Sequence, residues 1–185
     1  MDIERSIAMH CGPTLAGIKP ANILSISKAQ NSDMYLELEK MNMELNGFDI
    51  FFDVLCECKN RLLVIVYHKK NLYDYINRKE IAELLNLYGY PSVKNLDDCI
   101  EFLKYRISTS VEFPHEIGAF LGYPVCDIYG FIKHKNEGCK YTGYWKVYDN
   151  VEDTKRLFSE YDCCRNKFIK LMNNGAGLID LVCAS

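Results

Sequence analysis

The most densely specified stretch of this sequence reads Phe113-Pro114-His115-Glu116-Ile117-Gly118-Ala119-Phe120-Leu121-Gly122-Tyr123-Pro124. It combines two prolines, two glycines and a His-Glu pair with closely spaced apolar residues. Proline favours the first position of a helix, and glycine permits the left-handed turn that often follows one. Together with the apolar residues after it, the stretch predicts a helix-turn-helix-like pair at 114–133.

The sequence around this pair predicts an α+β fold in a single domain, 1–185, with a small, mainly antiparallel sheet of about four strands and six or seven helices. Alternating apolar residues predict two strands within 48–68, joined by a turn at Lys59-Asn60. Shorter strands are predicted at 22–27 and 141–148. Capping residues and helical spacing predict helices at 13–17, 32–47, 72–76, 78–88, 95–107, 125–133 and 150–173.

Composition and charge exclude several classes of protein. A net charge of −3 gives no general attraction to nucleic acid or to an anionic membrane. The longest apolar run, Leu62 to Tyr67, has the length of a strand, and the N-terminus lacks the basic and apolar regions of a signal peptide. Nine cysteines, an odd number, argue against a secreted disulfide framework. We therefore expect a cysteine-rich cytoplasmic protein with reduced thiols, in a reducing setting such as that of an anaerobe.

The His115-Glu116 pair resembles the start of a zinc-protease motif, but the second histidine of that motif is replaced by Ala119. The sequence therefore predicts no metal site there. Glu116 also fits a purely structural role, because the dipole of a helix favours a carboxylate in its first turn. No phosphate-binding glycine loop and no Gly-x-Ser-x-Gly motif is present.

Cys11 is the best candidate nucleophile. If a helical turn begins at Pro13, the thiol lies near a helix N-terminus, which lowers its pKa. His115 would then act as the base and Glu116 would orient it. The alternative is a small buried thiol that only packs.

Two cysteine pairs are candidates for a redox or metal site. Cys56 and Cys58 fall on a predicted strand and face the same side, whereas such pairs usually have a turn between the thiols. Cys163 and Cys164 fall on a predicted helix, where neighbouring side chains diverge. Neither pair has the spacing of a structural zinc site.

The segment 142–148 concentrates aromatic residues around one lysine. One interpretation is the wall of a pocket, in which Lys146 meets an anionic group and the aromatic rings stack on the ligand. The other is a core strand in which Tyr144 and Tyr148 flank the stem of Lys146.

Three motifs carry a family resemblance. Residues 10–20, 113–124 and 143–148, together with Tyr161-x-x-Cys164-Arg165, resemble the uncharacterised bacterial family known as domain of unknown function 3793. The resemblance spans nearly the whole chain and implies small, cytosolic proteins of anaerobic Gram-positive bacteria. It implies no activity.

These observations give three functional hypotheses. The first is a small-ligand or cofactor-binding protein whose pocket is formed by segments 10–20, 113–124 and 142–148, with a small anionic ligand as its partner and with no cofactor identified. Its ligand-binding residues would be His10, Lys19, Tyr144 and Lys146. The second is a cysteine-dependent hydrolase or transferase, with Cys11, His115 and Glu116 as catalytic residues. The third is a helix-turn-helix-type nucleic-acid or protein interaction module; the acidic residues and few basic ones of its second helix argue against nucleic acid.

Overall fold

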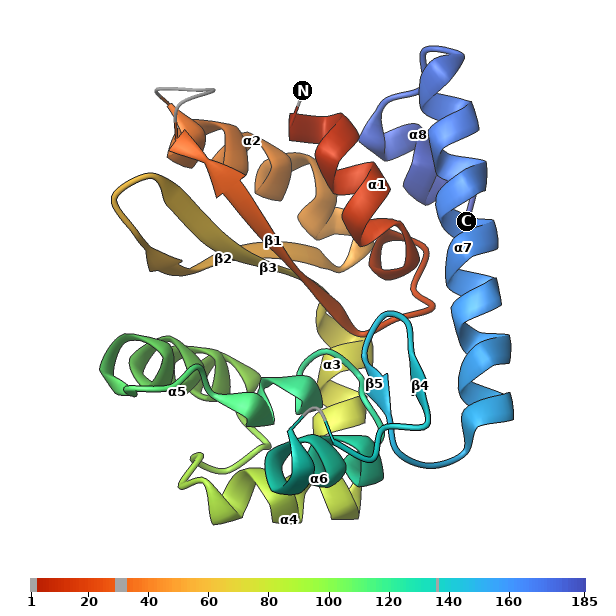
Figure 1. The fold of residues 1–185 in the computed structure, drawn as a ribbon. Helices are drawn as coiled ribbons and strands as arrows, with labels where there is room; N and C mark the ends of the chain where they lie inside the picture. The colour runs from red at the N-terminus through yellow and green to blue at the C-terminus, as the bar shows by residue number, and fades with distance from the viewer. Residues whose placement is uncertain (1–2, 29–32, 136) are drawn as a thin grey trace. The chain divides into compact units, whose positions relative to one another are not determined.

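Three antiparallel strands form the sheet of the N-terminal region in this computed structural model (Figure 1). The strands are β1 (Ala21–Ser27), β2 (Ile50–Glu57) and β3 (Arg61–His68), in the order β1-β3-β2. β-branched and aromatic residues dominate β2 and β3, as the pleated surface of a sheet favours. The structure describes residues 3–28, 33–135 and 137–185.

The chain divides into two compact units. The first unit is Met1–Leu72 with Cys164–Ser185, and the second unit is Tyr73–Cys163. The boundaries fall within α3 (Lys69–Ile76) and within α7 (Val151–Asn173), so that both helices belong partly to each unit. The prediction of a single domain stays a prediction.

Helices cover one face of the sheet in the first unit (Figure 1). The helices on the sheet are α1 (Ile3–Leu15) and α2 (Met34–Leu45), and a 3-10 turn, η2 (Asn46–Phe48), follows α2. The C-terminal part of α7 and α8 (Leu178–Cys183) pack beside α1 (Figure 1). Their apolar residues meet those of the strands in one core that includes Ile7, Leu38, Val64 and Phe168. Burial of this face supplies the main driving force for the unit.

The second unit is mainly helical. It contains α4 (Lys79–Leu87), α5 (Leu96–Thr109), the 3-10 helix η3 (His115–Ala119), α6 (Val125–His134) and the N-terminal part of α7. Two very short antiparallel strands, β4 (Tyr141–Thr142) and β5 (Lys146–Val147), form a hairpin. The hairpin packs with α7 through a core of Trp145, Val147, Phe158 and Tyr161.

The predicted α+β class and the antiparallel sheet are confirmed. The described residues form eight α-helices, where six or seven were predicted. The prediction did not include α8 or most of α1. The helix predicted to start at Pro13 is wrong: α1 contains Pro13 in its last turn, because Ile7, Ala8, Cys11 and Leu15 form a buried stripe that holds the preceding turns. The predicted cap Ser32 lies outside the described residues.

The continuous strand predicted at 141–148 is also wrong. The chain turns at 143–145, and the N–H of Gly143 donates to the carbonyl oxygen of Trp145 at 3.1 Å. A Cβ atom at Gly143 would lie 2.3 Å from the ring of Phe158, so only glycine fits this turn against the core. No helix that the structure describes is both long enough and apolar enough to cross a membrane.

Candidate functional site

The segment that opens the candidate site is η3, which begins after Pro114 and carries His115 and Glu116. Gly118 and Gly122 have different structural roles in this segment. Gly122 has a φ of 74°, the left-handed turn that leads to α6. A Cβ atom at Gly118 would lie 3.0 Å from side-chain atoms of both Ile128 and Tyr123, so glycine lets η3 approach α6 closely. The predicted pair is thus a 3-10 helix followed by an α-helix.

Glu116 is a buried carboxylate with a structural partner. It is 1% exposed, and it accepts hydrogen bonds from Nε and Nη2 of Arg106 at 2.9 and 2.8 Å. The hydroxyl of Tyr90 lies 3.5 Å from the same carboxylate oxygen. Burial, and then the charge of Glu116, raise the pKa of Tyr90, so this hydroxyl remains a donor. These bonds tie η3 to α5, and none of them reaches His115.

His115 is half-buried, and its ring meets Phe131 edge to face with the centroids 4.9 Å apart. The imidazole forms no hydrogen bond with any residue in the described part of the chain. The carboxylate of Glu116 bonds Arg106 and Tyr90 and does not bond His115, so its predicted role in orienting His115 stays a prediction.

Asp127, in the first turn of α6, is the second buried carboxylate of the unit, with 2% exposure. Its Oδ2 accepts from Nε1 of Trp145 at 2.8 Å. Its Oδ1 accepts from the backbone N–H groups of Tyr148 at 2.7 Å and Asp149 at 3.2 Å. A single side chain thus fixes the β4–β5 hairpin on α6.

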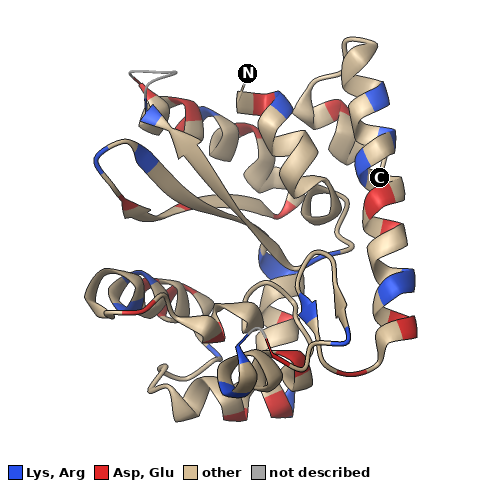
Figure 2. Ribbon diagram, viewed as in Figure 1, with Lys and Arg blue, Asp and Glu red and all other residues tan. Residues whose placement is uncertain are grey.

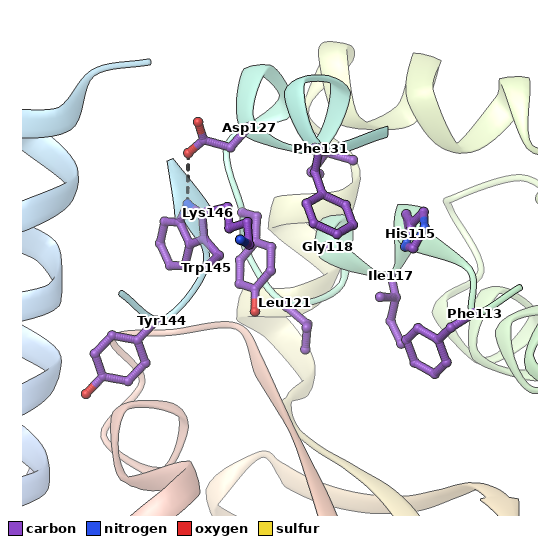
Figure 3. A pocket seen from close by; sticks show the side chains of 12 residues that line it. Phe113, His115, Ile117, Gly118, Leu121, Asp127, Phe131, Tyr144, Trp145 and Lys146 are labelled. Carbon is purple, nitrogen blue, oxygen red and sulfur yellow. Dashed lines mark hydrogen bonds between the residues drawn. The ribbon is translucent and has the colours of Figure 1, made fainter. Parts of the chain in front are cut away.

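Between these elements lies a pocket of about 430 Å³ (Figure 3). Trp145 and Lys146 of the hairpin lie on one side of it in Figure 3, and His115 and Ile117 of the η3 segment lie on the other. Its walls are mostly apolar or aromatic. The lining residues are Phe113, His115, Ile117, Gly118, Leu121, Tyr123, Asp127, Ile128, Phe131, Tyr144, Trp145 and Lys146.

Tyr144 and Lys146 differ in what they offer to this pocket. The hydroxyl of Tyr144 donates to Asp162 of α7 at 2.8 Å, and it points away from the other lining residues in Figure 3. Only its ring contributes to the wall. Lys146 is half-buried, and its ammonium group forms no hydrogen bond or ion pair with the residues that the structure describes. Lys146 therefore supplies the positive charge of the pocket.

The remaining predicted site residues belong to the first unit. His10 is exposed on α1, and its carbonyl oxygen accepts from Nδ2 of Asn22 at 2.6 Å. Cys11 is fully buried and Lys19 is 3% exposed. Burial raises the pKa of Cys11 to about 12 against an opposing effect of Lys19, and burial lowers the pKa of Lys19 to about 8 against the effect of Cys11.

This environment does not favour a thiolate. The predicted nearby helix N-terminus is absent, since Cys11 lies in the C-terminal half of α1, and the thiol carries its proton at neutral pH. Catalysis by Cys11 with His115 stays a prediction. Among the described residues, no group of three or more His, Cys, Asp or Glu is placed to hold a metal ion.

Of the predicted site residues, His115, Tyr144 and Lys146 line this pocket, and most of its aromatic residues fall in the predicted segments 113–124 and 142–148. Asp127 and Phe131 of α6, which also line it, were not predicted. A signal for Asp127 was present: it is an acidic residue beside apolar neighbours in a helix that buries one face. The interaction role predicted for 114–133 stays a prediction; the basic residues of α6, Lys133 and His134, stand in its last turn.

Comparison with known proteins gives one match. The model of the family described as "Protein of unknown function (DUF3793)" matches residues 7–182. No curated protein and no solved structure matches the chain.

Proposed function

We propose that this chain, which belongs to the DUF3793 family, binds in its second unit a small molecule with an apolar or aromatic body and one anionic group. The observation that carries the proposal is the pocket of about 430 Å³, in which Lys146 is the one cation among the lining residues that the structure describes. Small-molecule sites typically have about 300–1,000 Å³, apolar walls and a few polar groups that orient the ligand.

The aromatic wall supports the proposal for the body of the ligand. The rings of Tyr123 and Trp145 are stacked, with centroids 4.6 Å apart and planes at 27°. The bond from Trp145 to Asp127 holds the indole in place. A rigid aromatic surface of this kind receives a planar or branched apolar group at little cost in side-chain entropy.

Lys146 and His115 support the proposal for the anionic group. The ammonium group of Lys146 has no partner among the described residues, so it is available to pair with an anionic group of a ligand. The ring of His115, across the pocket, offers a second nitrogen donor. Tyr144 contributes its ring, whereas participation of His10, Cys11 and Lys19 stays a prediction.

Fluorescence of Trp145, the only tryptophan of the chain, tests the proposal directly. We would titrate the protein with anilinonaphthalene sulfonate, an anionic aromatic probe, and with a neutral anilinonaphthalene. We expect saturable quenching of Trp145 by the anionic probe at one site per chain. Lys146→Gln should weaken its binding about tenfold or more, because a hydrogen bond to a charged group contributes about 1.5–3 kcal/mol.

Lys140→Gln is the matched control. Lys140 belongs to the same hairpin region but does not line the pocket, and its long contact with Asp149 is exposed on both sides. Equal binding of the probe to wild type and Lys146→Gln would contradict the proposed anion site. Equal binding of the anionic and neutral probes to wild type would contradict it independently.

A further inference from the structure

We propose that the outer edge of β1 is a dimer interface, at which two copies of this chain pair their β1 strands antiparallel and join their sheets into one. This inference concerns the first unit and is independent of the pocket. It rests on the backbone groups that β1 directs away from β3 and on the neutral sequence of this strand.

The register of the sheet identifies the outward backbone groups of β1. In an antiparallel pair, every second residue exchanges both hydrogen bonds with the neighbouring strand, and the residues between direct their N–H and C=O groups the other way. Just beyond β1, the N–H of Lys28 donates to the carbonyl oxygen of Asn60 at 2.9 Å. The even-numbered residues of β1 are therefore bonded to β3, and Ile23, Ser25 and Ser27 direct their backbone groups away from it.

These outward groups have almost no partners. In the described part of the chain, only one of them is hydrogen-bonded: the carbonyl oxygen of Ser25 accepts from Nη2 of Arg61 at 3.4 Å, a long bond. Ser25 is exposed, and Ile23 and Ser27 are half-buried, so this part of the strand meets solvent. A row of open N–H and C=O groups is a template for another strand.

The opposite edge of the sheet, on β2, is closed. The side chain of Asn42 bonds both the N–H and the C=O of Phe52, at 2.8 and 2.9 Å. The register shifts between Val54 and Cys56, and Asp53 adds a charge to the strand. Bulges and charges of this kind keep edge strands from pairing. β1 has no bulge and no charged residue, and it is tan along its length in Figure 2.

The sequence of β1 fits a second copy of itself. When two β1 strands pair about a two-fold axis at Ser25, this residue opposes Ser25 of the partner subunit, and Ile23 opposes the partner's Ser27. Each pair joins outward donors to outward acceptors. On the face that carries α1 and α2, Leu24 opposes the partner's Ile26, which extends the apolar layer. Because the strand is neutral, no like charges meet, and nothing on it selects a charged peptide instead.

Sedimentation of the full chain in the analytical ultracentrifuge tests the proposal. We expect the weight-average mass to rise from 21.4 kDa toward twice that value between micromolar and near-millimolar protein. Ser25→Lys would place two lysines opposite each other and should keep the chain monomeric, because like charges at this position oppose strand pairing. Ser159→Lys, at an exposed position of α7, is the matched control and should dimerise like wild type.

Amide hydrogen exchange followed by NMR reports the same pairing residue by residue. In wild type, exchange at Ile23 and Ser25 should slow by about tenfold or more as the protein dimerises, whereas Leu24 and Ile26, bonded to β3, should be protected at every concentration. Protection of Leu24 and Ile26 in Ser25→Lys shows that the variant is folded.

Three results would overturn the proposal. The first is a wild-type chain that stays monomeric at near-millimolar concentration. The second is dimerisation of Ser25→Lys to the same extent as Ser159→Lys. The third is exchange at Ile23 and Ser25 that stays fast while the mass doubles, since the dimer would then use another surface.

Discussion

Replacement of Asp127 by asparagine tests how the pocket is held together. The carboxylate accepts from Trp145 through one oxygen and from the backbone of Tyr148 and Asp149 through the other. Asparagine has the same shape but only one acceptor oxygen. If that oxygen keeps the two backbone donors, the amide group of asparagine faces the indole N–H, and two donors oppose each other in a buried place.

The expected loss follows from these bonds. One hydrogen bond to a charged group, worth about 1.5–3 kcal/mol, disappears, and the indole N–H is left without an acceptor. We therefore expect Asp127→Asn to lower the free energy of unfolding by about 2–3 kcal/mol. With a slope of about 1–3 kcal/mol per molar urea, the midpoint should fall by about 1 M.

Urea titration followed by Trp145 fluorescence reports this unit, because Trp145 is the only tryptophan. Asp149→Asn is the control, since Asp149 is exposed and pairs with exposed Lys140 at 3.6 Å; we expect a change below about 0.5 kcal/mol. In a Trp145→Phe background, followed by far-UV circular dichroism, Asp127→Asn should cost clearly less. Equal costs in the two backgrounds, or a cost no larger than that of Asp149→Asn, would refute the anchoring role.

Two further changes test the other buried charges. Arg106→Met should lower the free energy of unfolding by about 3 kcal/mol, because it leaves the carboxylate of Glu116 buried without its cation. Urea titrations would measure this loss. Lys104→Met, which breaks a partly exposed ion pair on the same helix, is the control. Because burial lowers the pKa of Lys19 to about 8 from 10.5, this residue binds more protons in the unfolded chain from pH 8 to 9, so Lys19 should add about 1 kcal/mol to the free energy of unfolding across that interval. Cys11 acts in the opposite direction, because burial raises its pKa, so the effect is measured as the difference between wild type and Lys19→Met in urea titrations followed by circular dichroism at each pH.

The sheet was predictable because its signals are local. In the β2–β3 hairpin, alternation, β-branched residues and a polar turn agree, and the observed strands lie within the predicted segment. The cap of α5 is equally local: Oδ1 of Asn95 accepts from the N–H of Asp98, as the pattern predicted. Segment 141–148 failed because its pattern of aromatic residues fits a strand, while the contact of Gly143 with Phe158 depends on a helix later in the chain.

The candidate site was predictable only in part, for a similar reason. Composition and spacing pointed to His115 and Lys146, which are polar residues within apolar segments. The partner of Glu116 is Arg106, ten residues away on another helix, and nothing in the local sequence distinguishes that arginine from a solvated one. The raised pKa of Cys11 comes from its tertiary burial, which a helix-start signal in the local sequence does not encode.

The two buried carboxylates bear on the anion selectivity that we propose for the pocket. Glu116 is bonded to Arg106, and Asp127 is bonded to the β4–β5 hairpin, so neither carboxylate is available to bind a ligand. Asp127 lines the pocket as a structural anchor, whereas Glu116 is not among the lining residues. The polar groups left to face the pocket are then the ammonium of Lys146 and the imidazole of His115. A cation and a nitrogen donor against apolar walls favour an amphipathic anion over a neutral or cationic molecule.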